Sequence, residues 1–259
     1  AIHTFTYTPA GFSYNEAPWA SIVNEYVNAI PHYVEPFIDY AGVEFERLIS
    51  SQGEPFMSSS VLAQYLVYRA VKKSGFTVCL EGQGADEMLA GYDGFPSYYL
   101  RSLYANKCLM PLLIFSHSVA NHSGWGALVT ALARSLVPES MACRLRNFSL
   151  ISASGLFNKS YLVSQGINHI TRRVNPFEDD PAIPTRRLAD ELRHCLSGHG
   201  LAALLRHSDR NSMAFSVESR VPFLTTRLAE LSLGMPENLL VSKYFETKYI
   251  LRESMRGIV

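Results

Sequence analysis

The chain has 259 residues, of which 47% are hydrophobic and 18% charged, a globular composition sufficient for one large domain or two small ones. Lysine plus arginine and aspartate plus glutamate both number 23, so the chain has no overall basic field that would attract nucleic acid or an anionic membrane surface. The longest apolar run, at residues 108–115, is far shorter than the ~20 residues of a membrane span. The four cysteines, at positions 79, 108, 143 and 195, are widely spaced, and we expect reduced thiols in a cytoplasmic protein.

The first third of the chain alternates between strand and helix patterns. Runs of β-branched and aromatic residues predict strands, and apolar residues at helical spacing predict helices. The expected elements are a strand at 2–8, a helix at 18–30, a strand at 32–37, two helices divided near 53–55 with the second at 58–73, and a buried strand at 76–80. This order is typical of a parallel sheet covered by helices on both faces.

After residue 92 the alternation stops and helical patterns follow one another. They cover 97–155, 186–206, 208–217, 222–233 and 246–256, with a linker rich in proline and aspartate at 174–185. We therefore predict an α/β fold in which a partial parallel sheet flanked by helices, at residues 1–100, is followed by an all-helical half at 101–259.

The stretch "FTVCLEGQGADEMLAGY" (76–92) predicts a strand, a tight glycine turn and a helix that opens with two acids. Gly82 and Gly84 would let backbone N–H groups approach a phosphate. The dinucleotide motif G-x-G-x-x-G does not fit, because Glu87 stands at its third glycine. The residues leave two interpretations open: the acids stabilise the helix dipole, or Asp86 binds Mg²⁺ beside substrate phosphates.

A second cluster of charges lies among apolar residues near the C-terminus. Asp209, Arg210, Glu218 and Arg220 are predicted on or near a half-buried helix, where unpaired charges would be costly. Two roles remain open for them: ion pairs that lock helices together, or an active site.

Three segments resemble the synthetase domain of the asparagine synthetase family. They are "EGQGADEMLAGY" (81–92), "DRNSMAFSVESRVPFL" (209–224) and "TKYILRESMRG" (247–257), and weaker matches are "HTFTYTPAGFSYNEAPWA" (3–20) and "GEPFMSSSVLAQY" (53–65). The resemblance covers nearly the whole chain and is weakest at 100–184. It implies an adenine-nucleotide-hydrolase-like fold, with an incomplete nucleotide-binding half at 1–100 and a half at 101–259 that completes the acyl- and amide-forming site.

The resemblance implies ATP-dependent amide formation by a carbon–nitrogen ligase. In this family a carboxylate such as aspartate attacks the α-phosphate of ATP, and ammonia or an amine then displaces AMP from the acyl-adenylate. The implied cofactors are ATP and Mg²⁺. The implied partners are a small-molecule carboxylate, an ammonia or amine donor, and a glutaminase domain in the full-length parent, in asparagine biosynthesis or a related pathway; no nucleic-acid or membrane partner is expected.

Site residues follow from the resemblance position by position. Asp86 matches the magnesium-binding aspartate, Glu81, Gly82 and Gly84 match the nucleotide-binding turn, and Tyr7 matches the strand residue that contacts adenine. Lys248 matches the lysine near the phosphates, Glu218 and Arg220 match an E-x-R motif whose glutamate assists amine attack in some relatives, and Gln83 stands beside the reacting groups.

The sequence departs from the family pattern in several places. The pyrophosphate-binding loop S-G-G-x-D-S should precede residue 2, so we expect a longer parent to supply it and this piece alone to be nearly inactive. The alternative is a non-catalytic binding or scaffold relative that kept the fold. Gln83 stands where a glutamate is linked to aspartyl-adenylate formation, and Gln cannot act as a base. Glu81 and Thr225 also differ from the residues usual at their positions.

Overall fold

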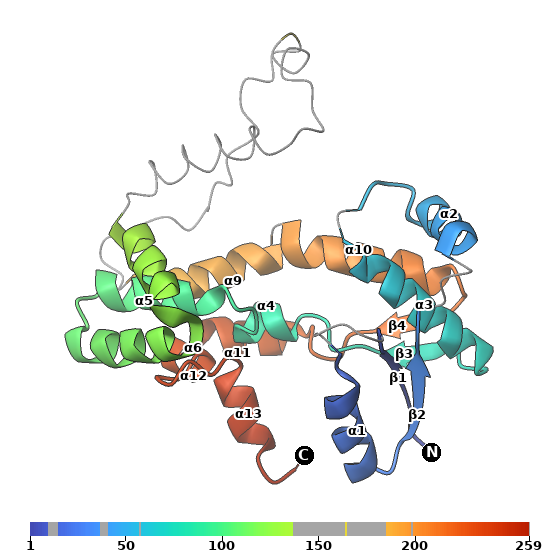
Figure 1. Ribbon diagram of the computed structural model, residues 1–259, viewed down its shortest axis with the longest axis horizontal. Coiled ribbons are helices and arrows are strands. Elements are labelled where there is room, and N and C mark those ends of the chain that lie inside the picture. The colour runs from blue at the N-terminus through green and yellow to red at the C-terminus, as the bar shows by residue number, and fades with distance from the viewer. Residues whose placement is uncertain are drawn as a thin grey trace. The chain divides into compact units, whose positions relative to one another are not determined.

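The computed structural model describes residues 1–9, 15–36, 41–56, 58–136, 164, 185–197 and 199–258 (Figure 1). The chain forms two compact units, each assembled from segments distant in sequence. Unit 1 comprises Ala1–Met88, Cys195–Ser232 and Leu251–Val259, and unit 2 comprises Leu89–His194 and Leu233–Ile250. The functional division at residue 100 stays a prediction.

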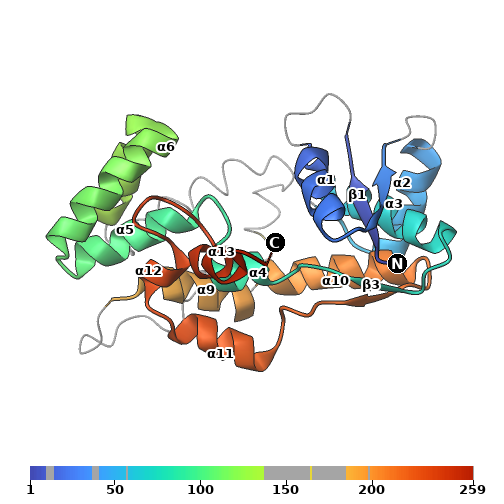
Figure 2. The ribbon, with the colours of Figure 1, turned by 90° about the horizontal axis from the view of Figure 1, so that it is seen from below.

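The described strands of unit 1 form two small parallel sheets. Strand β1 (His3–Tyr7) pairs with β2 (Ile30–Val34), with Tyr7 opposite Val34. Strand β3 (Val78–Leu80) pairs with β4 (Glu218–Arg220). Helix α1 (Ala17–Tyr26) connects β1 to β2 and packs against both (Figure 2). The predicted α/β class with parallel strands is therefore confirmed, and the adenine-nucleotide-hydrolase-like arrangement stays a prediction.

Helices from both ends of the sequence pack together in unit 1. Helix α3 (Ser60–Lys73) lies against β1 and β2, and α10 (His199–Met213) lies against α3 and α2 (Ala41–Gln52) (Figure 1). The apolar faces of these elements explain the contacts, because helical spacing places their large side chains on one side. The predicted division of the two helices near residues 53–55 is confirmed.

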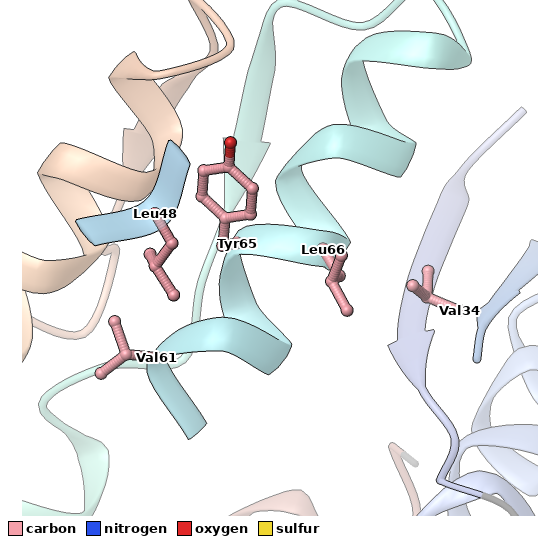
Figure 3. Close-up of a cluster of buried hydrophobic side chains, with 5 residues drawn as sticks. All are labelled: Val34, Leu48, Val61, Tyr65 and Leu66. Carbon is pink, nitrogen blue, oxygen red and sulfur yellow. The ribbon is translucent and has the colours of Figure 1, made fainter. Parts of the chain in front are cut away.

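Among the described residues, the core of unit 1 contains two apolar clusters. In the first, Val34 from β2 and Leu48 from α2 pack against three residues of α3, namely Val61, Tyr65 and Leu66 (Figure 3). The second centres on Tyr68, Val71 and Val217, against which Phe5 of β1 and Cys79 of β3 pack. Residues of both sheets thus share one cluster.

In the described part of the chain, four helices end in the same hydrogen-bonded motif, a Schellman motif with one residue at positive φ. These residues are Asn28, Gly75, Lys107 and Ser216, with φ of 50°, 86°, 54° and 52°. At the end of α10, the amide of Ser216 donates to the carbonyl of Met213 at 3.0 Å, and that of Val217 donates to Ser212 at 3.0 Å. At each of these helix ends the chain changes direction, and the next element follows the motif.

These helix ends correct three predicted boundaries. The helix expected at 18–30 ends at Tyr26, and the strand expected at 32–37 instead spans Ile30–Val34. The helix expected at 208–217 belongs to α10, which ends at Met213. Asn28 ends α1 and Ser216 ends α10 in the left-handed conformation. Glycine is the residue by which such a helix end is usually recognised in a sequence.

The expectation of an all-helical second half is wrong at β4. Val217 is fully buried, and the three residues after it pair with β3 instead of continuing a helix. The expected burial of strand 76–80 is also wrong, because Val78 is 43% and Leu80 69% exposed.

Unit 2 is built on helices. Helix α5 (Phe95–Ala105) packs against α6 (Leu109–Leu136), with the rings of Tyr99 and Phe115 edge to face at 4.9 Å, and α6 bends at Gly124, which has a φ of 84°. These helices confirm the helical prediction over its described part; residues 137–155 and 174–184 lie outside the described residues. None of the helices described is both long and apolar enough to cross a bilayer.

The start of α9 (Arg187–Ser197) is held by a buried acid. The carboxyl of Glu237, at the start of α12 (Glu237–Leu240), accepts a hydrogen bond from the amide of Ala189 at 3.0 Å. Burial raises the pKa of Glu237. Three further described helices belong to the motif segments: α4 (Ala85–Leu89) contains the candidate Asp86, and α11 (Thr226–Gly234) and α13 (Tyr249–Met255) follow candidate residues.

Candidate functional site

The turn after β3 depends on a glycine at position 84. Gly84 is buried and has a φ of 91°, a left-handed conformation that side chains disfavour. A Cβ built there would lie 2.1 Å from Cδ2 of Leu224, whereas a Cβ at Gly82 would meet nothing within 4 Å. Gly84 therefore brings the turn into contact with the second motif, and Gly82 leaves its backbone open.

The two acids after the turn have different surroundings. Both lie in the first turn of α4, as predicted, where they complement the helix dipole. Glu87 is only 2% exposed, whereas Asp86 is partly exposed at the start of the helix. Of the two, Asp86 is the side chain that a ligand can approach.

Asp86 fits the requirements of Mg²⁺ better than those of a metal held entirely by protein. Among the residues with described positions, no three His, Cys, Asp or Glu side chains gather to hold a metal. Mg²⁺ usually binds one or two carboxylates together with substrate phosphates and water. One accessible carboxylate beside an open glycine turn is therefore compatible with this ion, and the stabilising role at the helix start is compatible with it too.

The glycine turn and the second motif are joined through the backbone. The amide of Glu218 donates to the carbonyl of Thr77 at 2.7 Å, and that of Glu81 donates to Arg220 at 2.8 Å. Leu224 of the same motif contacts Gly84. Unit 1 thus brings together Glu81, Gly82, Gln83, Gly84 and Asp86 on the turn with Glu218 and Arg220 on β4.

The predicted charge cluster separates into two roles. Arg210 donates to the main-chain carbonyl of Gln52 and lies 3.3 Å from Glu54, so it ties α10 to the end of α2. Glu218 and Arg220 instead pair with each other at 2.8 Å on the surface, 59% and 60% exposed. An exposed ion pair adds little stability to the fold. Because both side chains are exposed, a ligand can reach them.

The Glu218–Arg220 pair keeps both groups ionised. The hydrogen bond and charge of Arg220 lower the pKa of Glu218, and Glu218 raises that of Arg220. The glutamate is therefore an ionised acceptor at neutral pH. Glu218 begins β4, a strand in the half predicted to be all-helical.

The carboxyl of Glu81 points into unit 1. It accepts hydrogen bonds from the hydroxyl of Tyr68 and from that of Ser208 at 2.9 Å, and the amide of Gln64 lies 3.5 Å away. Burial raises the pKa of Glu81. The side chain of Glu81 therefore connects the turn to α3 and α10. With the side chain engaged in this way, the main chain of Glu81 is the part left to contact a nucleotide, and that contact stays a prediction.

A buried amide network continues from this carboxyl. Asn211 is fully buried and donates to the carbonyl of Val61 and to Oε1 of Gln64, both at 2.9 Å. The amide of Gln52 donates to Oδ1 of Asn211 at 2.8 Å, and its own oxygen lies 2.7 Å from Nδ1 of His207. The sequence reasoning missed these residues. The signal was polar side chains three or four positions apart on helix faces that are otherwise apolar.

We predict that Glu81→Gln raises the free energy of unfolding of the chain at neutral pH. Between the ordinary glutamate pKa of 4.5 and the raised value, the folded protein holds a proton that the unfolded chain releases. The free energy of unfolding therefore falls as the pH rises through this window, and it stays lower above it. Glutamine keeps an acceptor for Tyr68 and Ser208 without a buried charge.

Urea unfolding at several pH values tests this effect. The stability difference between Glu81→Gln and wild type should grow as the pH rises from 4.5 and then level off. The exposed Glu230→Gln is the matched control. A difference that is constant with pH, or equal to that of the control, would contradict a buried charge at Glu81.

Two other predicted site residues belong to elements other than the turn and β4. Tyr7 ends β1 and packs against the cluster of Val34 and Tyr65, and burial raises its pKa. Lys248 belongs to unit 2 and has a φ of 51°. It follows a tight loop closed by a bridge between Val241 and Thr247. The helix ends at Asn28, Lys107 and Ser216 have the same left-handed conformation, so the φ of Lys248 does not by itself indicate a functional role.

Comparison with known proteins decides the family. No match was found among curated proteins. The family model described as asparagine synthase matches residues 1–259. The chain belongs to the asparagine synthase family. At the family level, an asparagine synthase is an ATP-dependent synthetase of the ligase type that acts on small molecules.

Proposed function

We propose that this chain is the synthetase part of an ATP-dependent, amide-forming ligase. It would activate a small carboxylate as an acyl-adenylate and transfer the acyl group to ammonia or an amine. The observation that carries the proposal is the glycine turn, where Gly84 and Leu224 join the two family motifs beside the accessible Asp86. The membership of the whole chain in the asparagine synthase family supports the same reaction class.

The nucleotide would lie along the turn. The open backbone at Gly82 would donate to phosphate oxygens, with Gly84 setting the direction of the chain, and Tyr7 would supply the adenine contact. Asp86 would hold Mg²⁺, which neutralises charge on the phosphates when bound. Glu81 would contribute by positioning the turn through Tyr68 and Ser208.

The two chemical steps need different groups. When the carboxylate attacks the α-phosphorus, the bond to the bridging oxygen of pyrophosphate breaks, and Lys248 would stabilise the departing charge. In the second step the attacking amine loses a proton, and Glu218 would accept it, with Arg220 keeping the carboxylate ionised and oriented. Gln83 can orient the carboxylate substrate by hydrogen bonding but cannot accept its proton.

The decisive experiment is ATP–pyrophosphate exchange with substitutions in the natural protein. Asp86→Ala and Lys248→Ala should each lower the exchange rate by about 100-fold or more, since each removes a charge that acts on the phosphates. Asp209→Ala and Lys243→Ala, which change exposed residues of the same types, are the controls and should retain exchange.

The outcomes separate the candidate functions. Normal exchange in Asp86→Ala or Lys248→Ala would contradict the roles given to these residues. A wild-type natural protein that binds ATP with Mg²⁺ but catalyses pyrophosphate exchange with no carboxylate of a broad panel would instead favour a non-catalytic binding protein with the family fold.

A further inference from the structure

A basic cavity lies in unit 1 outside the proposed active site. It has a volume of about 410 Å³ and is lined by Glu44, Arg47, Arg69, Lys72, Lys73 and Phe215. Cavities that hold small molecules span roughly 300–1,000 Å³. The size therefore suits a small ligand, and the lining is dominated by one sign of charge.

The single acid of the lining is already engaged by arginine. Glu44 is 5% exposed, and its Oε1 lies 2.9 Å from Nη1 of Arg69 and 3.5 Å from Nη1 of Arg47. Lys72 and Lys73 add two further cations from the last turn of α3. The described lining thus holds four cations and one buried carboxylate, and an anion in the cavity would reduce the repulsion among the cations.

One wall of the cavity is aromatic. Phe215 lies in the turn that ends α10, and its ring packs on that of Tyr65 with centroids 4.6 Å apart. The backbone of this turn also contacts one of the cations, because the carbonyl of Ser216 accepts a hydrogen bond from Nζ of Lys72 at 3.5 Å. The Phe215 ring is therefore fixed by its packing on the core residue Tyr65, and a flat apolar group of a ligand could pack against it.

The topology separates this cavity from the glycine turn. Lys72 and Lys73 precede β3, and Phe215 precedes β4, which runs parallel to β3. Gly82, Gly84 and Asp86 follow the other end of β3. The two locations therefore lie at opposite ends of the same pair of strands.

We infer that this cavity is a second anion site, which binds a small molecule carrying a phosphate group. Arginine and lysine are the side chains that bind phosphate most strongly, and two arginines with two lysines line the cavity. Phe215 would contact an aromatic group attached to the phosphate. The inference does not depend on the proposed ligase activity.

Calorimetric titration of the chain with inorganic phosphate and with phenyl phosphate tests the site. EDTA is present and Mg²⁺ is absent, so that binding through Asp86 and a metal is not measured. Both probes should bind at low ionic strength and weaken as salt increases. Phenyl phosphate should bind more tightly if the natural ligand carries its phosphate on an aromatic group, and equal affinities would identify the free anion.

Variants locate the binding. The double variant Arg47→Gln/Lys73→Gln should weaken both probes about tenfold or more, equivalent to ~1.4 kcal/mol. Arg227→Gln/Lys107→Gln removes the same charge from other surfaces and should change affinity less than about twofold. Phe215→Leu should weaken phenyl phosphate selectively. Asp86→Ala should leave binding intact even where it abolishes exchange in the natural protein.

Three results would overturn the inference. They are the absence of binding by either probe, an equal loss in the control double variant, and a loss of binding in Asp86→Ala, which would place the anion at the glycine turn. Circular dichroism spectra of the variants must match that of the wild type, and Lys72→Gln provides an independent single change if the double variant does not fold.

Discussion

Gly84→Ala is expected to lower the free energy of unfolding by about 2–5 kcal/mol. Two costs combine, because alanine must adopt a φ of 91° and its Cβ would approach Cδ2 of Leu224 to 2.1 Å. The contact between Gly84 and Leu224 joins the two family motifs. A backbone shift that relieved the clash would therefore move the turn away from β4. Urea unfolding followed by circular dichroism measures the loss.

The chain offers a matched control two residues away. Gly82→Ala adds the same methyl group where nothing lies within 4 Å, and its effect should stay within about 1 kcal/mol. Adding Leu224→Ala to Gly84→Ala should recover the steric part of the loss and leave the part due to backbone conformation. Equal effects of Gly84→Ala and Gly82→Ala would show that the turn does not require glycine at position 84.

Asn211→Ala should destabilise unit 1 by about 3–5 kcal/mol, the second large effect. The side chain is fully buried and makes hydrogen bonds with Gln52, with Gln64 and with the carbonyl of Val61. Truncation leaves these groups buried with fewer partners, at a cost of roughly 1–3 kcal/mol for each unsatisfied group. It also removes one of the links between α10 and both α2 and α3.

Asp209→Ala is the control for this change, because it truncates an exposed side chain on the same helix. Its effect should stay within about 0.5 kcal/mol. Asn211→Leu separates packing from hydrogen bonding, since leucine fills a similar volume without polar atoms. If Asn211→Leu is as stable as wild type, the amide network contributes nothing to stability, and the expected loss in Asn211→Ala would be attributed to a cavity.

Local features of the fold could be predicted from sequence. The strand, glycine turn and acidic helix start at 76–92 follow from β-branched residues, two glycines and two acids in order. The helices from Ala17, Ala41 and Ser60 follow from apolar spacing, with Gly53 marking one boundary by its φ of 63°. Each of these depends on residues within a few positions of one another.

Features that depend on distant residues could not be predicted. Ser216 ends α10 in a conformation usual for glycine, so the pattern continued into residues that form β4. Glu81 resembles an exposed ligand-binding acid until Ser208, 127 positions away, is placed beside it. The likeness of motifs identified the family, and the site segments stay a prediction; the division between inward and outward side chains required the packing of α3 and α10.

The pairing of β3 with β4 has a consequence for biosynthesis. The glycine turn is complete only when Ser208, Arg220 and Leu224 are present, so its final structure must wait for the last third of the chain. At a translation rate of about 5–20 residues per second, the 127 positions between Glu81 and Ser208 delay it by on the order of ten seconds. During that interval Val78 and Leu80 emerge as an unpaired strand edge, a stage at which a nascent chain is open to association with chaperones or with other copies.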